Sequence, residues 1–204
     1  KLAEIGFKPI EPDPCLYVGD VDGHKTYLGI YVDDIIVAAQ TTEIAQKTKR
    51  VFATRFKIKD MGQLHHFLGV RIHQYKDGSV WIGQDQYCQK VLKKFGMETC
   101  KPVSTPMEEG SQKIKKAARD IKESELFNQS IYQSIVGSLL YLAIATRPDI
   151  TYAVSKVAQF ASRPTKTHFK LTKRIMRYLQ GTMELGMLYK ANGNQQLIGY
   201  SDSD

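Results

Sequence analysis

Two adjacent carboxylates, Asp33 and Asp34, are the residues of this sequence best suited to chemistry. An apolar, β-rich run precedes them at Tyr27–Val32 and resumes at Ile35–Ala39, which predicts a hairpin with both carboxylates at its tip. Like charges this close repel each other, so at least one carboxylate must face solvent or a cation. Mg²⁺ takes one or two carboxylates together with substrate phosphates, so the hairpin suits phosphoryl transfer. A metal-free, Asp-rich turn is the alternative, because aspartate favours turns.

A second candidate site is a basic stretch later in the chain. Residues 163–180 contain six basic side chains and no acidic one. Five of them follow roughly helical spacing, namely Lys166, Lys170, Lys173, Arg174 and Arg177, opposite a stripe of Phe169, Leu171, Ile175 and Leu179. Basic side chains on phosphates release counterions, so nucleic-acid binding by this face would be salt-sensitive. An ordinary solvated helix face is the alternative.

The histidines and cysteines give weaker signals. His65 and His66 are adjacent and so point apart on a strand or helix, which disfavours a metal site. Cys15, Cys88 and Cys100 lie far apart without metal-ligand spacing, which indicates a reducing compartment and argues against structural zinc. We expect Cys88 and Cys100 to be core residues or inert thiols.

The strands that would position these residues are marked by turn signals. Asp22-Gly23 predicts a hairpin between Leu16–Val18 and Tyr27–Val32. Asp77-Gly78 predicts another, and Asn192-Gly193 predicts a third. The strands flanking these last two turns are expected at Leu68–Gln74, Val80–Ile82, Leu185–Tyr189 and Gln196–Asp202.

Helical periodicity fills the intervals between the hairpins. Thr42 is expected to cap a helix that buries Ile44, Thr48, Val51, Phe52 and Phe56. A second helix from Gln84 would bury Tyr87, Val91, Leu92 and Phe95 and stop at Gly96. Three more helices are expected at about 129–145, 149–161 and 165–180. The predicted fold class is therefore α+β.

Composition is that of a soluble globular protein. The chain has 204 residues, of which 42% are apolar and 25% charged. A formal charge of +8 favours a polyanionic partner, and no apolar run approaches the roughly 18–20 residues needed to span a bilayer. Residues 101–125 contain prolines and few large apolar side chains, so we expect a polar linker there.

Several motifs resemble those of one family. Tyr31-Val32-Asp33-Asp34 between two β-rich runs resembles the polymerase motif of reverse transcriptases. Downstream motifs narrow the resemblance to the Pol polyprotein of copia-type retrotransposons, in family order over nearly the whole chain. They are FKIKDMG at 56–62, LGV at 68–70, CKPVSTP at 100–106, VGSL at 136–139, TRPDI at 146–150, RYLQGT at 177–182 and GYSD at 199–202.

The resemblance implies a two-Mg²⁺ mechanism for nucleotidyl transfer. Asp33 would be the principal metal ligand of this motif and Asp34 a weaker one. The family takes a further essential aspartate from an upstream strand. None of the earlier acidic residues has that setting, and Asp13 and Asp20 are expected in loops. We therefore expect a fragment with an incomplete site, inactive as an isolated chain.

The resemblance also implies subsidiary roles. Asp202 matches the first metal ligand of the ribonuclease H domain that follows in these polyproteins. Tyr31 would contact the primer or template, or pack in its strand. Leu68 and Gly69 resemble the primer grip, although turn packing explains them as well. Lys59 lies where a lysine can act as general acid on pyrophosphate, or it is simply solvated.

These implications define the expected organisation. Residues 1–83 would be the C-terminal part of a reverse-transcriptase palm and 84–100 a thumb-side helix. The linker 101–125, a helical thumb and connection region at 126–184, and the first hairpin of a truncated ribonuclease H domain at 185–204 would follow. Expected partners are an RNA or DNA template–primer, deoxynucleoside triphosphates and the rest of the polyprotein, without a membrane.

Two other functions stay open at this point. The chain could be a non-catalytic nucleic-acid-binding remnant of a degenerate element, with Asp33 and Asp34 serving only as a turn. It could also be a structural subunit that completes its site with another chain. The expected location is intracellular and reducing, in a cytoplasmic retroelement particle if the element is active.

Overall fold

The computed structural model describes residues 2–110, 122–192, 199 and 201. The chain forms two compact units, Lys1–Leu64 and His65–Asp204, and each is described by itself. Helices and antiparallel sheets contribute to both, so the α+β class is confirmed at that level. No helix in the described ranges is long and apolar enough to cross a membrane.

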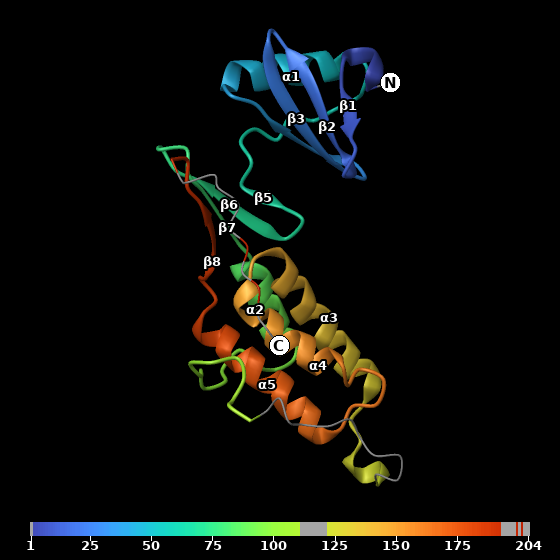
Figure 1. Cartoon of the computed structure of the whole chain (residues 1–204), viewed down its shortest axis with the longest axis vertical. Coiled ribbons are helices and arrows are strands. Elements are labelled where there is room, and N and C mark those ends of the chain that lie inside the picture. Colours follow the sequence, from blue (N-terminus) through green and yellow to red (C-terminus); the bar gives the residue numbers. More distant parts are fainter. Residues whose placement is uncertain (1, 111–121, 193–198, 200, 202–204) are drawn as a thin grey trace. The chain divides into compact units, whose positions relative to one another are not determined.

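The first unit is an antiparallel meander covered by a helix (Figure 1). Its strands are β1 (Lys8–Ile10), β2 (Asp13–Val21), β3 (His24–Tyr31) and β4 (Asp34–Ala38), paired in sequence order. A short 3₁₀ turn, η1 (Ala3–Ile5), precedes them and α1 (Thr42–Ala53) follows. The β2–β3 and β3–β4 hairpins are confirmed, whereas strand β1 and its pairing with β2 were not expected from the sequence.

The predicted Asp22-Gly23 turn is confirmed. Val21 pairs with His24, and the two residues between them have φ values of 54° and 78°. Positive φ at both central residues is the type I′ geometry that Asp-Gly favours and that matches the twist of the flanking strands. The turn fixes the register of β2 and β3, and thereby of the strand that leads to Asp33.

Helix α1 holds the sheet from one side. Its N-cap is Thr41, whose hydroxyl accepts from the Ile44 amide at 3.3 Å, so the expected cap at Thr42 is wrong by one residue. The helix buries Ile44, Thr48 and Phe52, spaced one helical turn apart. Val51, expected on the same stripe, is 38% exposed because it points off that line.

The second unit begins with another antiparallel sheet. Its strands are β5 (His66–Phe67), β6 (Val70–Gln74), β7 (Val80–Gly83) and β8 (Gly186–Tyr189), in that order. The predicted hairpin around Asp77-Gly78 is confirmed as β6–β7. Strand β8 is confirmed as a strand but pairs with β7, from Val80↔Tyr189 to Gly83↔Gly186. Its expected neighbour, residues 196–202, lies outside the described residues apart from Gly199 and Ser201.

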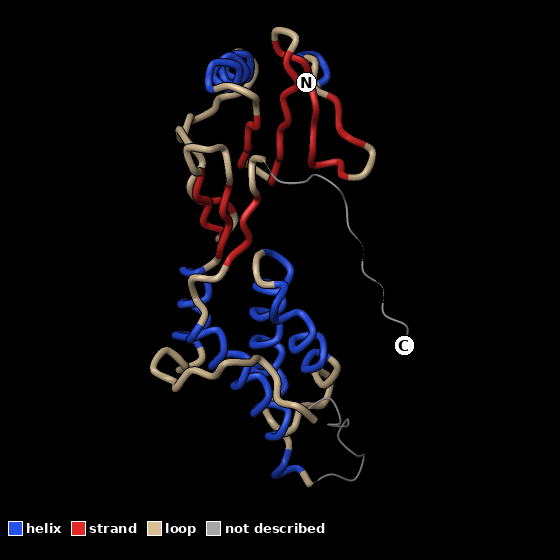
Figure 2. The backbone as a smooth tube through the Cα atoms, turned by 60° about the vertical axis from the view of Figure 1, so that its left-hand side comes forward, coloured by secondary structure: helices blue, strands red, loops and turns tan. Residues whose placement is uncertain are grey.

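Helices make up the rest of this unit and gather as a bundle below its sheet (Figure 2). They are α2 (Asp85–Lys94), α3 (Gln129–Ala145), α4 (Thr151–Ala158) and α5 (Lys166–Gly181), with short 3₁₀ turns η3 (Glu123–Glu125) and η4 (Pro148–Ile150). The expected helix at 149–161 is thus η4 followed by α4. Gly96, with φ 65°, follows α2 as the predicted stop.

One core joins these helices across the linker. Cys88 and Leu92 of α2 pack in the same buried cluster as Leu139 of α3, Val154 of α4 and Ile175 of α5. Burying these apolar faces together removes them from water, which is the main stabilising term. The polar stretch at 101–125 therefore separates α2 from α3 in sequence but not in the core.

Candidate active site and nucleic-acid interface

Asp33 and Asp34 lie at the β3–β4 hairpin, as predicted. Tyr31 pairs with Asp34, so Val32 and Asp33 are the two central residues of the turn. Val32 has φ 52° whereas Asp33 is not in the positive region. Positive φ at the first central residue alone is characteristic of a type II′ turn, where glycine is usual. A β-branched residue there is strained by about 1–3 kcal/mol, and such strain concentrates at functional sites.

Both carboxylates are exposed at this turn. Within the described ranges no hydrogen bond or ion pair engages either side chain, whereas Asp22 at the opposite turn is paired with Lys47. Two unneutralised carboxylates at successive positions of one turn would attract a divalent cation. Tyr31, which lies across the hairpin from Asp34, is 53% exposed and is therefore available for contact.

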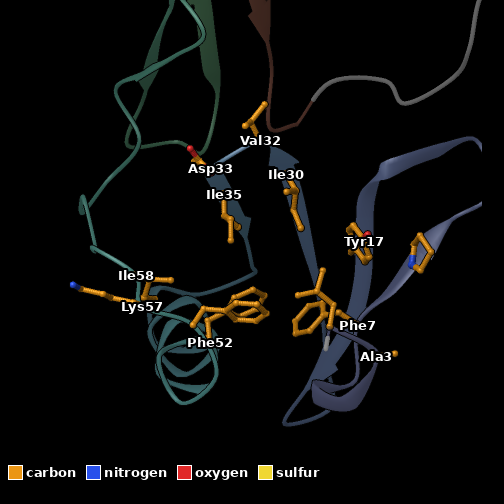
Figure 3. A pocket seen from close by; sticks show the side chains of 13 residues that line it. Ala3, Phe7, Tyr17, Ile30, Val32, Asp33, Ile35, Phe52, Lys57 and Ile58 are labelled. Atoms are coloured by element: carbon orange, nitrogen blue, oxygen red, sulfur yellow. The ribbon is translucent and has the colours of Figure 1, made fainter.

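A cavity of about 590 Å³ lies beside the turn, with Asp33 among its lining residues. Figure 3 shows Phe7 and Phe52 facing each other at one end and Val32 and Asp33 at the other. The ring centroids of Phe7 and Phe52 are 5.8 Å apart. The site thus combines an acidic rim with apolar walls.

Two lysines of the 56–62 motif lie in different settings relative to this cavity. Lys57 lines the cavity and extends outward in Figure 3. Lys59, predicted to be either a general acid or a solvated lysine, is exposed and does not line the cavity. Nearby, Lys49 Nζ lies 2.7 Å from Asp60 Oδ1, and the Gly62 amide donates to the same oxygen at 2.9 Å. These bonds fix the 56–62 motif after α1, and the bond from Lys49 is the main reason that the pKa of Asp60 is lowered.

The donor set fits part of a magnesium site. Mg²⁺ accepts one or two protein carboxylates and completes its shell with water and phosphate oxygens, which Asp33 and Asp34 allow. Among the described residues no three His, Cys, Asp or Glu side chains gather as a metal cluster.

The earlier acidic residues do not join Asp33. Asp13 and Asp20, expected in loops, lie in β2, and that expectation is wrong. Asp13 Oδ1 accepts from the Cys15 amide and Asp20 Oδ1 from the Gly23 amide, both at 2.8 Å. Both carboxylates therefore stabilise local turns in the backbone.

The Leu68-Gly69 turn of the second unit is held in place by a side chain of helix α3. Phe67 pairs with Val70, and Leu68 and Gly69 have φ values of 49° and 77°, a type I′ pattern with a non-glycine residue at positive φ. The Tyr141 hydroxyl on α3 donates to the Leu68 carbonyl. Tyr141 itself packs edge-on against Tyr87, with centroids 4.9 Å apart. Leu68 is 42% exposed, so a rigid turn presents it to solvent.

The basic side chains of α5 divide into two groups. Lys166, Lys170 and Lys173 are exposed, and Lys173 lies over the Phe169 ring at 5.2 Å. Arg174 and Arg177 are half-buried because they hold the segment 101–108 against the helix.

Three contacts hold that segment. Arg177 Nε donates to the Lys101 carbonyl at 2.7 Å. Arg174 donates to the Thr105 hydroxyl at 3.0 Å and is ion-paired with Glu108. The structure therefore brings the CKPVSTP motif onto the face that the sequence assigns to nucleic acid.

Arg147 of the TRPDI motif organises a buried network that sequence reasoning missed. Its side chain is 2% exposed and donates to Asp149 at 2.9 and 2.8 Å and to the Thr182 carbonyl at 2.9 Å. The Tyr178 hydroxyl also donates to Asp149, at 2.8 Å. Burial alone would raise the pKa of Asp149, but the bonds from Arg147 and Tyr178 outweigh it and lower that pKa. The TRPDI and RYLQGT motifs thus meet in one structural network.

The remaining candidates stand apart from these sites. Cys88 is buried, and burial raises the pKa of its thiol to about 11, in keeping with an inert thiol. His65 and His66 both line a hollow on the sheet of the second unit, although adjacent residues were expected to point apart. Asp202 lies outside the described residues.

Comparisons with known proteins agree on one family. The family model described as "Reverse transcriptase (RNA-dependent DNA polymerase)" matches residues 1–109. The Pol polyproteins of transposons RE1 and RE2 from Arabidopsis thaliana are 37% and 34% identical over the whole chain. An uncharacterized mitochondrial protein of the same plant is 35% identical over 87% of the chain and 71% of its own length. No solved structure matches the chain.

The chain covers only part of the polyproteins. It spans 13% of the RE1 polyprotein and 14% of the RE2 polyprotein. The described motifs therefore correspond to one region of much longer proteins.

Proposed function

Since the chain belongs to the reverse transcriptase (RNA-dependent DNA polymerase) family and is similar to a segment of copia-type Pol polyproteins, we propose that it serves RNA-directed DNA synthesis. In that role it supplies the hairpin that carries Asp33 and Asp34. The substrates are deoxynucleoside triphosphates and an RNA or DNA template–primer. The primer 3′-hydroxyl attacks the α-phosphate, a new P–O bond forms, and pyrophosphate leaves.

The carboxylates of the β3–β4 turn hold the metal in this proposal. Asp33 is the principal ligand and Asp34 the weaker one. Bound Mg²⁺ supplies Lewis-acid stabilisation of the charge that develops on the phosphoryl group. As the family resemblance implies, a further carboxylate would come from a strand upstream of this hairpin.

One observation carries this proposal above all. A strained Val32 presents two carboxylates that engage no other described side chain, beside a cavity that Asp33 lines. A plain Asp-rich turn needs no valine at positive φ. The surrounding sheet must therefore stabilise a conformation that the turn sequence alone disfavours, and catalysis gives a reason for it.

Secondary contacts would position the template–primer. The exposed Lys166, Lys170 and Lys173 would contact phosphates, and such contacts orient a duplex without reading its sequence. Leu68 and Gly69 would support the primer end as a rigid turn, and Tyr31 would contact the primer or template. Arg174 and Arg177 are assigned to the segment 101–108 instead.

Further parts of the proposal concern the polyprotein. Asp202 would be the first metal ligand of a following ribonuclease H domain, and residues 185–204 would begin that domain. Residues 1–83 would belong to the palm, and 84–100 with 126–184 to the thumb and connection region. The free thiols of Cys15, Cys88 and Cys100 suit a reducing compartment such as a cytoplasmic particle.

Magnesium-dependent primer extension on an RNA template tests this function. The chain is compared with a longer reading-frame segment that adds upstream residues, and with Asp33→Asn in that segment. Asp20→Asn is the matched control, since the side-chain oxygen of asparagine can still accept the hydrogen bond from the backbone N–H of Gly23. Extension by the longer segment and its Asp20 variant, with none by the chain alone or by Asp33→Asn, is the expected result.

Binding without extension would give a different answer. If the longer segment binds template–primer but never extends it, the catalytic proposal fails. The chain is then a nucleic-acid-binding remnant. If Asp33→Asn extends as well as the parent, the metal assignment fails while polymerase activity stands.

A further inference from the structure

A hollow of about 490 Å³ lies on the sheet of the second unit, and the function proposed above does not use it. Its lining is unusual in consisting mainly of rings and one guanidinium. The lining residues are His65, His66, Arg71, Ile72, His73, Tyr75, Trp81 and Glu184.

Strand register places four of these residues, His66, Arg71, His73 and Trp81, on one face of the sheet. Arg71 is opposite His66 on β5 and Gly83 on β7, and His73 is opposite Trp81. Residues directly opposite each other in an antiparallel pair share a face, and so do residues two apart on one strand. Tyr75, at the end of β6, continues the row and is 46% exposed.

Two glycines allow Trp81 to lie flat on that face. Gly83 and Gly186 form a pair on β7 and β8, and a Cβ at either position would overlap the Trp81 indole. The Arg71 guanidinium lies over this indole, 4.9 Å from its centroid. The sheet therefore carries an ordered stack of indole and guanidinium, with His73 edge-on to Tyr75 at 4.5 Å.

Arg71 has two acidic neighbours and is held firmly by neither, since its Nε and the nearby Asp85 Oδ1 form no hydrogen bond with each other. Its Nε lies 3.0 Å from Asp85 Oδ1, whereas its Nη2 lies 3.4 Å from Glu184 Oε2, a carboxylate whose side chain is 83% exposed. An exposed ion pair of that length contributes little, so another anion can replace Glu184 at small cost. A phosphate can take that place, because its oxygens, like those of a carboxylate, accept two parallel hydrogen bonds from a guanidinium.

We propose that this face binds a single strand of nucleic acid. Bases stack on Tyr75 and His73, and a backbone phosphate takes the place of Glu184 on Arg71. Stacking on aromatic and guanidinium planes is the usual way in which single strands are held, because unpaired bases expose their faces and paired ones do not. The formal charge of +8 on the chain favours a polyanion over a neutral peptide.

This inference deepens the proposed function and rests on it. A polymerase must accommodate the unpaired template strand as well as the duplex. The ring-lined face is formed by residues other than those of the Leu68-Gly69 turn and the lysines of α5. It gives the chain a subsite for unpaired nucleotides.

The test measures binding of a fluorescent 12-nucleotide oligothymidylate to the full chain, with inorganic polyphosphate as a base-free competitor. Tyr75→Ala is expected to weaken binding about tenfold and Tyr75→Phe to leave it unchanged, because stacking needs the ring and not the hydroxyl. Glu184→Gln is expected to strengthen binding about twofold by removing the competing carboxylate. Tyr189→Ala is the matched control: Tyr189 is an exposed tyrosine of the same sheet, opposite Val80 and so on the other face.

Several results would overturn the inference. One is that Tyr75→Ala and Tyr189→Ala lower the affinity for oligothymidylate equally. Another is that Tyr75→Phe lowers this affinity as much as Tyr75→Ala does. The third is that polyphosphate displaces oligothymidylate to the same extent from the parent and from Tyr75→Ala. Unchanged thermal unfolding of Tyr75→Ala excludes a folding defect. Primer extension by the longer segment, if retained in Tyr75→Ala without any change in single-strand binding, would refute this subsite and leave the proposed polymerase function intact.

Discussion

At the residue scale, the carboxylate turn owes its shape to Val32. The side chain is 83% exposed, so almost no buried area compensates for its positive φ. Hairpin pairing from Tyr27↔Ala38 to Tyr31↔Asp34 holds the residue in that conformation. The strain at Val32 is confined to the turn, and the hydrogen-bonded pairing of the flanking strands offsets it.

Replacing Val32 with glycine should relieve this strain. Glycine adopts positive φ freely but loses more chain entropy on folding, so we expect a net gain of about 1 kcal/mol in the free energy of unfolding. Chemical denaturation followed by circular dichroism measures it. Val37→Gly on β4, where the residue is half-buried at ordinary φ, should instead destabilise. A loss of stability in Val32→Gly would show that the turn is not strained.

Asp149 gives a second residue-scale prediction. Its pKa is lowered in the folded chain, so its ionised form contributes stability above the ordinary carboxyl pKa of about 3.9. That contribution is lost as pH falls through the lower, folded-state pKa. Asp149→Asn should therefore flatten the acid side of a plot of unfolding free energy against pH, and Tyr178→Phe should flatten it less. An acid side parallel to that of the parent would contradict this role.

At the scale of elements, turn chemistry and helical periodicity could be read from the sequence. Asp22-Gly23 and Asp77-Gly78 mark real hairpins, because few residues accept the φ values that such turns need. The periodicity at 129–145 and 165–180 corresponds closely to α3 and α5. These features depend on local backbone preferences, which neighbouring residues determine.

Long-range pairing could not be read in the same way. Strand β8 lies about a hundred residues after β7 in the chain, and its place in that sheet depends on Trp81 fitting over Gly83 and Gly186. The roles of Arg174 and Arg177 likewise depend on where 101–108 runs. Basic residues at helical spacing look alike whether they face solvent or a carbonyl.

The division of α5 can be tested through salt dependence. Changing Lys166, Lys170 and Lys173 together to glutamine should lower the slope of log binding constant against log salt for a template–primer duplex. The magnitude of this negative slope should fall by roughly 2 to 3, since each lysine–phosphate contact contributes about 0.9 to it. Gel-shift titrations across a salt series measure the slope.

Arginine variants of the same helix provide the contrast. Arg177→Gln should leave the salt slope nearly unchanged and expose the segment 101–108 to proteolysis instead, because it removes the bond to the Lys101 carbonyl. If Arg177→Gln changes the slope as much as the lysine variant does, the arginine contacts nucleic acid directly.

At the scale of the whole molecule, the two units offer different surfaces. The first unit carries the carboxylate turn and the cavity beside it. The second carries the Leu68-Gly69 turn, the lysines of α5 and the ring-lined face. The chain spans 13% of the RE1 polyprotein, and in the proposed function these surfaces would serve one longer polymerase.

The roles of Asp33 and Asp34 give the most direct test. In the longer polyprotein segment, single-nucleotide incorporation is measured with Asp33→Asn and Asp34→Asn over a range of Mg²⁺ concentrations. Asp33→Asn should lower the rate by about 1,000-fold at every concentration, because the principal ligand supplies several kcal/mol. Asp34→Asn should lose less and recover as Mg²⁺ rises. Equal rates in the parent and both variants would show that the turn holds no catalytic metal.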